Sequence, residues 1–145
     1  IKTNAITEAD LFDRNYVPIP NTDPLKHSTR FDVFTDKVLP DIQEPILSEA
    51  CILYAGAVDN NGYFPTHNKC FSQPLTGNYD TDIVKNRTKR IFDDPTGSRC
   101  GNHDKNFLIQ TYKRDTGEIV HDLSVPIYIN GKQWGGFRIG YKSTH

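Results

Sequence analysis

The chain has 145 residues, of which 36% are hydrophobic and 24% are charged, and its formal net charge is −1. This is the length of a single domain, residues 1–145, that buries a core without metal or disulfide staples. A near-neutral chain lacks the basic excess of nucleic-acid-binding proteins, and no apolar run approaches the roughly 18 residues of a membrane helix. Because the chain starts at Ile1 and contains no methionine, we expect it to be a domain excised from a longer protein.

Residues 1–50 are predicted to be an N-terminal helical region. Thr7 before two acidic residues is typical of the start of a short helix, and the three prolines within residues 18–24 indicate extended structure after it. Apolar residues then recur at helical spacing, and Pro40 and Pro45 predict a kink or two helices in series. We expect the apolar stripe to pack on a sheet; it consists of Phe31, Phe34, Val38, Leu39, Ile42 and Ile46.

Residues 51–58 are apolar on both faces, as in a strand that is covered on both sides of a sheet. A turn and a second strand at residues 62–68 follow, and Pro65 places the second strand at a sheet edge. We expect these two strands to form a hairpin. Residues 69–106 are predicted to form a long helical or irregular excursion, with a helix within residues 79–90 and a turn at 93–97.

The last third of the chain predicts an antiparallel meander. Three β-rich runs within residues 107–142 are joined by turns at 115–117 and at Asn130-Gly131, which is a strong hairpin signal. Gly135-Gly136 indicates a bulge or a close approach of backbones.

Alternation along the middle run predicts which side chains face the core. His121 lies in an otherwise apolar row, which we expect to be the inner face, whereas Asp122 and Ser124 fall in the outer row. In total, residues 51–142 predict a five-stranded antiparallel sheet, with the N-terminal helices and the excursion between the second and third strands covering it. This is an α+β fold, and its element order is that of PAS-like and single-Cache sensor domains.

Several stretches within residues 8–142 carry a more specific resemblance. They are Asp10-Leu-Phe-Asp-Arg-Asn-Tyr16, Ile19-Pro-Asn-Thr-Asp-Pro24, Val38-Leu-Pro-Asp-Ile-Gln-Glu44, Asp59-Asn-Asn-Gly-Tyr-Phe-Pro-Thr-His-Asn68, Phe71-Ser-Gln-Pro74, Asn86-Arg-Thr-Lys-Arg-Ile-Phe-Asp-Asp94, Leu108-Ile-Gln-Thr-Tyr-Lys-Arg114 and Trp134-Gly-Gly-Phe-Arg138. Together they resemble an extracytoplasmic domain of bacterial methyl-accepting chemotaxis proteins. The resemblance implies a periplasmic, PAS-like or Cache-like domain of an inner-membrane receptor. It also implies a small-molecule ligand, a homodimer and an output through the chemotaxis histidine kinase, with no nucleic-acid partner.

Basic and aromatic residues are the candidate ligand contacts. Arg87 and Arg90 lie in a basic cluster that is either a solvated helix face or a source of the arginine fork that holds a carboxylate. His121 is either a core residue or a ligand contact. Aromatic side chains with a polar tip suit both a pocket and a core. The candidate ligand-binding residues are Tyr54, His67, Arg87, Arg90, Tyr112, His121 and Trp134.

Two pairs of residues suggest a metal site. His67 with Cys70, and Cys100 with His103, together offer a Cys₂His₂ set to zinc. A disulfide between Cys70 and Cys100 and a set of unrelated thiols are the competing interpretations. Some sensors of similar fold carry covalent haem through Cys-x-x-Cys-His. Cys100-Gly-Asn-His103 lacks the second cysteine and the adjacent histidine, so only non-covalent haem with a histidine ligand stays open.

No nucleophile motif, glycine-rich phosphate loop or pair of catalytic carboxylates stands out, so we expect a binding domain and not an enzyme. The preferred function is ligand sensing with transmission of a conformational signal across the membrane. A haem- or metal-based redox or gas sensor on the same scaffold is the alternative, and an enzyme built on that scaffold ranks third, since a fold does not determine a function.

Overall fold

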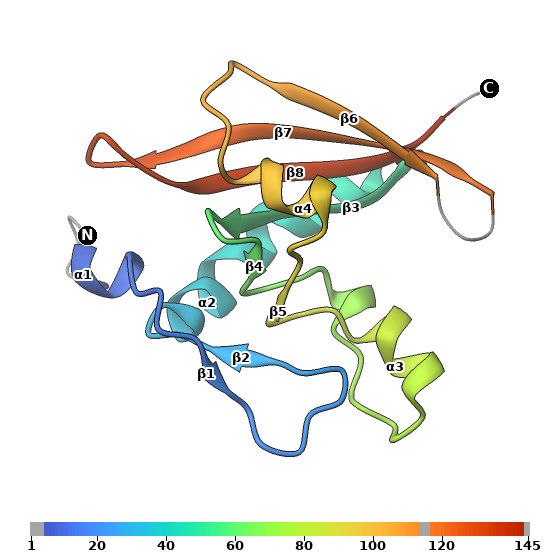
Figure 1. Ribbon diagram of the computed structural model, residues 1–145, viewed down its shortest axis with the longest axis horizontal. Helices are drawn as coiled ribbons and strands as arrows, with labels where there is room; N and C mark the ends of the chain where they lie inside the picture. The colour runs from blue at the N-terminus through green and yellow to red at the C-terminus, as the bar shows by residue number, and fades with distance from the viewer. Residues whose placement is uncertain (1–4, 114–116, 144–145) are drawn as a thin grey trace.

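The computed structural model describes residues 5–113 and 117–143. Its main feature is a four-stranded antiparallel sheet, accompanied by two small sheets and by helices, so the predicted α+β class is confirmed. Figure 1 shows the main sheet along the top of the molecule, with the N-terminal elements and the excursion below it. The strands of the main sheet are, in spatial order, β3 (Ile52–Asp59), β8 (Lys132–Lys142), β7 (Ile119–Ile129) and β6 (Leu108–Lys113).

The N-terminal region contains the predicted helices. Thr7 caps the first of them by accepting a hydrogen bond from the Asp10 amide, and Pro40 lies within the second. A 3-10 helix with Pro45 in its first turn follows directly, so the predicted pair of helices in series is confirmed. The elements are α1 (Glu8–Leu11), β1 (Val17–Pro18), β2 (His27–Ser28), α2 (Asp32–Gln43) and η1 (Glu44–Ser48).

The buried side of α2 differs from the predicted apolar stripe. Phe31 is fully buried, but Val38 and Ile42 are 36% and 57% exposed. Polar residues are buried on α2 instead, namely Asp32, Thr35 and Gln43. The reason is that α2 packs beside β3 with hydrogen bonds as well as apolar contacts: the Gln43 Oε1 atom accepts from the Ala57 amide at 3.0 Å.

The predicted first hairpin does not extend the main sheet. β4 (Tyr63–Phe64) has only two residues and pairs with β5 (Arg90–Ile91), so the main sheet has four strands and not five. Side chains satisfy the outer edge of β3 where a fifth strand would pair. Asn68 donates to the Ala55 carbonyl and accepts from the Ala55 amide, both at 2.9 Å, while Gln43 occupies the next position.

The excursion crosses one face of the sheet. It contains η2 (Lys69–Phe71), α3 (Tyr79–Lys85) and α4 (Pro95–Cys100), and α4 replaces the turn predicted at residues 93–97. Asp94 caps α4 and Pro95 begins it. α4 contacts β6, β7 and β8, and it approaches closely at Gly136, where an added Cβ atom would lie 2.2 Å from the Cys100 carbonyl oxygen.

The β7–β8 hairpin has the predicted Asn130-Gly131 turn, with positive φ angles of 50° and 78°. The predicted bulge is also present, because the pairing shifts by one residue between Tyr128↔Gln133 and Ile127↔Gly135. The predicted turn at 115–117 begins at residues that lie outside the described ranges, and Gly117 has the positive φ of a turn.

The faces of β7 are the reverse of the prediction. Asp122 and Ser124 are fully buried, whereas Ile119 and Val125 are 44% and 40% exposed. The face that carries Asp122 lies beneath α4, and the row that contains His121 lies on the other side of the sheet. In the part of the chain that the structure describes, none of the helices has the length and apolar character needed to cross a membrane.

Candidate functional site

A cavity of about 180 Å³ lies between the main sheet and the excursion. The sheet contributes Tyr54 from β3, Tyr112 from β6 and Arg138 from β8. The other walls come from the segments around β4, β5 and α4, and consist of Phe64, His67, Arg87, Phe92, Asp94 and Thr96. Four of the seven candidate residues, Tyr54, His67, Arg87 and Tyr112, are thus brought together around one cavity.

The floor of the cavity is a buried ion pair. Nε and Nη2 of Arg138 both lie 2.8 Å from Oδ2 of Asp122, which is fully buried. The Tyr54 hydroxyl donates to the same carboxylate oxygen and accepts from Nη2 of Arg138 at 3.3 Å. Burial opposes the charge of Arg138, but the electrostatic contributions of Tyr54, Cys100 and Asp122 raise its pKa.

A second set of donors completes the shell of Asp122. The Cys100 thiol donates to Oδ1 at 3.0 Å, and burial, reinforced by Asp122, raises the pKa of this thiol to about 12. Next to it, the buried Ser124 hydroxyl lies 3.0 Å from Nε2 of His103. Because both oxygens of Asp122 accept from protein donors, this carboxylate has little capacity left for a ligand.

The guanidinium group of Arg138 uses Nε and Nη2 for its hydrogen bonds to Asp122 and Tyr54. The side chain is 7% exposed and lines the cavity, yet its Nη1 group makes no hydrogen bond within residues 5–113 and 117–143. Arginine carries five N–H donors in a fixed fork. The two hydrogens on Nη1 are therefore available to a ligand.

His67 is a neutral ring with one uncommitted donor. Its ring stacks on Phe64, with the centroids 3.9 Å apart, and its Nδ1 atom accepts a hydrogen bond of 2.8 Å from the Asn68 amide. Burial, followed by the charges of Arg87 and Arg138, holds the pKa of His67 well below its ordinary value. A neutral histidine that accepts at Nδ1 carries its proton on Nε2, so this N–H is available on the cavity side.

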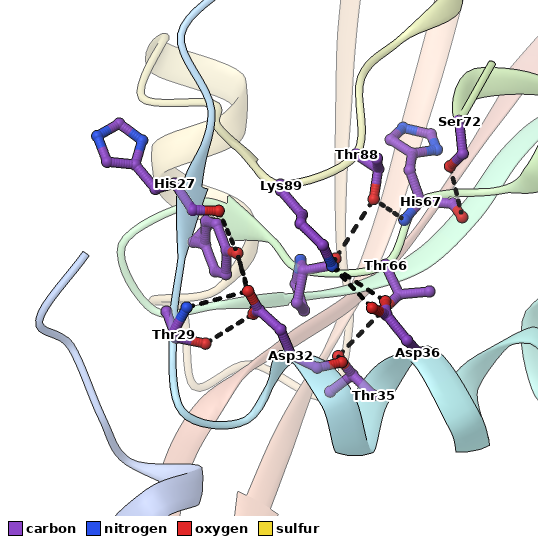
Figure 2. Close-up of polar contacts among 12 residues, drawn as sticks. His27, Thr29, Asp32, Thr35, Asp36, Thr66, His67, Ser72, Thr88 and Lys89 are labelled. Atoms are coloured by element: carbon purple, nitrogen blue, oxygen red, sulfur yellow. Dashed lines mark hydrogen bonds and ion pairs between the residues drawn. The ribbon is translucent and has the colours of Figure 1, made fainter. Parts of the chain in front are cut away.

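Figure 2 shows how the segments that carry His67 and Thr88 are held against α2. The Thr66 hydroxyl donates to Asp36 at 2.6 Å, and the Lys89 ammonium donates to Asp36 at 3.0 Å. The Lys89 ammonium also donates to the Pro65 carbonyl at 2.9 Å, which ties the two segments to each other. The His67 amide donates to the Thr88 hydroxyl at 3.2 Å. This network fixes the position of the cavity walls relative to α2.

The remaining candidate residues lie elsewhere. Arg90 donates from Nη1 to the Ile83 carbonyl at 3.1 Å and lies over the Phe92 ring. His121 contacts Thr111 at 2.9 Å on the opposite side of the sheet. Trp134 belongs to the apolar core with Phe31, and its indole N–H donates to the Leu11 carbonyl at 2.7 Å.

Arg138 and its partner Asp122 were not predicted as site residues. The available signal was a lone arginine among glycines and apolar residues in the last strand, with an acidic residue on the neighbouring strand. Asp122 was placed on the outer face because a polar row is ordinarily the solvated one. Phe64, Phe92 and Thr96 carried no local signal, because the path of the excursion decides where they lie.

The predicted metal ligands do not form a centre. All three cysteines are free: Cys51 and Cys70 are exposed and Cys100 is buried, so the alternative of a Cys70–Cys100 disulfide is not what forms. Within the described ranges, no group of three or more His, Cys, Asp or Glu side chains is arranged to hold a metal ion. A cavity of about 180 Å³ is smaller than the roughly 300–1,000 Å³ of pockets for drug-sized ligands, and a porphyrin exceeds it.

Comparison with known proteins finds no match, since no family model, no curated protein and no solved structure shows significant similarity to this chain.

Proposed function

We propose that this chain is the extracytoplasmic ligand-binding domain of a bacterial chemoreceptor, and that it binds a small molecule in the cavity between the sheet and the excursion. The observation that supports this most directly is a pair of donors, Nη1 of Arg138 and Nε2 of His67, which belong to side chains that are 7% exposed and line the cavity, and which have no hydrogen-bond partner within residues 5–113 and 117–143. Small-molecule sites are largely apolar cavities on which a few polar groups converge. Two donors that face one cavity are therefore suited to a partner that arrives from outside.

The fold supports the same proposal in outline. The resemblance implies a sensor sheet of five strands. The main sheet has four, β3, β8, β7 and β6, and they correspond to the expected sheet without its second strand. β8 is paired on both sides and carries Arg138. In the proposed receptor a ligand on Arg138 acts on this strand, and β8 passes the change through Lys142 to the membrane and on to the histidine kinase of a dimeric receptor in the inner membrane.

A thermal-shift screen with amino acids, organic acids, amines and purines tests the binding function. A ligand of the folded state raises the melting temperature with increasing concentration. We expect each true hit to disappear in Thr96→Phe, which places a ring in the cavity. Thr111→Phe is the matched control, because Thr111 lies on the exposed face of β6.

The two variants decide the outcome. Hits that Thr111→Phe keeps and Thr96→Phe loses support the proposal. A screen without hits, or hits that both variants keep, contradicts it. In the full-length receptor, the same ligand is expected to change the activity of the histidine kinase, and Thr96→Phe is expected to remove that response.

A further inference from the structure

We infer that the ligand is a compact organic anion, a carboxylate with a flat apolar body, held by Arg138 and His67 in the cavity. This inference rests on the proposed function and names the chemical class of the ligand.

The buried part of the cavity offers donors, and the carboxylate beneath it is already occupied. Nη1 of Arg138 and Nε2–H of His67 donate, and both side chains are only 7% exposed. The nearest buried carboxylate, Asp122, already accepts from Arg138, Tyr54 and Cys100. A ligand that accepts hydrogen bonds therefore fits this arrangement, and charge-assisted bonds to arginine are about twice as strong as neutral ones.

The charges around the cavity also favour an anionic ligand. Arg87 and Arg138 line it, and together with Arg90 they lower the pKa of His67. Among the described residues that line the cavity, the acidic one is Asp94, which is exposed and accepts from the Gly97 amide as the cap of α4. A cationic ligand would add a further positive charge beside these arginines, whereas an anion would add a negative charge that both attract.

Size and shape restrict the anion further. The cavity of about 180 Å³ is close to the roughly 150 Å³ of a cavity that holds benzene. Its side walls are the flat rings of Phe64 and Phe92, which lie edge to face with centroids 6.2 Å apart, and the ring of Tyr112. These walls suit a planar apolar group, and the size suits a single ring or a short chain that carries one carboxylate.

Titration calorimetry with three probes of equal shape tests the charge. Benzoate, benzamide and benzamidine share a ring and differ in the charge of their planar head group. We expect benzoate to bind about ten- to a hundredfold more tightly than benzamide, as a charge-assisted hydrogen bond provides, and benzamidine to give no heat of binding. The larger 2-naphthoate tests the size and is expected to bind more weakly than benzoate.

Two arginine variants locate the bound anion. Arg87→Gln removes a charge that lines the cavity and leaves the Asp122–Arg138 pair in place. Arg99→Gln removes the charge of an exposed residue on α4 that does not line the cavity. We expect the first to weaken benzoate binding about tenfold or more and the second to change it less than about twofold.

The possible outcomes separate the two proposals. Benzamide or benzamidine that binds as tightly as benzoate, and is lost in Thr96→Phe, overturns the anion but leaves the ligand-binding function standing. Benzoate binding that Arg87→Gln and Arg99→Gln weaken equally also overturns the assignment to this cavity. If neither the three probes nor any compound of the screen binds, both the anion and the proposed function fail.

Discussion

Asp122 and Arg138 form their buried ion pair only because β8 contains one extra residue at its bulge. Near the turn Tyr128 pairs with Gln133, but beyond the bulge Ile127 pairs with Gly135. Paired residues share a face, and a shift by one residue moves every later side chain to the opposite face. Without the bulge, Arg138 would lie opposite Leu123 on the side that carries His121; with it, Arg138 lies opposite Ser124, on the face of Asp122.

Removing one partner of this pair is expected to destabilise the protein strongly. Arg138→Gln leaves Asp122 with an uncompensated buried charge, so we expect the free energy of unfolding, measured in urea, to fall by about 3–5 kcal/mol. Glu8→Gln is the control, because Glu8 and Lys132 form an exposed pair at 3.7 Å that contributes at most about 1 kcal/mol. Equal effects of the two substitutions would show that the buried pair is not special.

The stability of the protein is expected to fall in mild acid because of His67. Its pKa in the folded state lies well below the ordinary 6.5. Between these two pKa values, His67 is protonated in the unfolded chain and neutral in the folded protein. The contribution of the neutral ring is therefore complete above pH 6.5 and is lost as the pH falls toward the folded pKa. At pH 5.5, one unit below the ordinary pKa, the loss is at most about 1.4 kcal/mol.

His67→Gln removes this titrating group and provides the comparison. We expect the difference in unfolding free energy between pH 7.5 and pH 5.5 to be smaller in the variant by that amount. The same slope in both proteins would mean that His67 does not titrate in this range on unfolding.

Cysteine reactivity is expected to divide the thiols into two classes. Cys51 and Cys70 are exposed, whereas Cys100 is buried and its pKa is raised to about 12. The thiolate is the form that attacks a thiol reagent at pH 8, so native protein should release colour for the two exposed thiols and the third should react only after unfolding. Rapid modification of Cys100 in the native protein, read by peptide mass mapping, would contradict the packing of α4.

Gly140 is expected to be required for the position of Tyr54. A Cβ atom there would lie 2.1 Å from Cε2 of the Tyr54 ring. Gly140→Ala should therefore displace the ring and destabilise the protein by about 1–3 kcal/mol, as overpacking does. In a double-mutant cycle, Tyr54→Leu should recover part of this loss, and strictly additive effects would show that the two residues do not compete for space.

The parts of the fold that follow from local chemistry were predicted from the sequence. The Thr7 cap, the prolines of α2 and η1 and the Asn130-Gly131 turn each act through their own backbone, so their residue types suffice. The face of β7 could not be predicted in this way. Periodicity locates the two rows of a strand, but hydrophobicity assigns the inner one only where the core is apolar, and here a polar site lies beneath α4.

Only part of the candidate site could be predicted, because only some of its residues are recognisable from their type alone. Tyr54, His67 and Tyr112 stand out as aromatic residues with a polar tip, whatever the fold. Arg138 and Asp122 become partners only through the bulge, and Phe92 reaches the cavity only because β4 leaves the main sheet to pair with β5. Such long-range choices depend on the total packing and not on any short stretch of sequence.

The side chains that finish the outer edge of β3 also make the cavity stiff. Asn68 closes that edge at Ala55, and it directly follows His67. A ligand that displaced His67 would therefore also pull Asn68 away from β3. The amide and carbonyl of Ala55 would then lose their partners, at a cost of about 1–3 kcal/mol for each group. Because this wall resists displacement, a molecule slightly larger than the cavity is excluded and not accommodated. The rigidity of the wall therefore makes the cavity selective for ligand size.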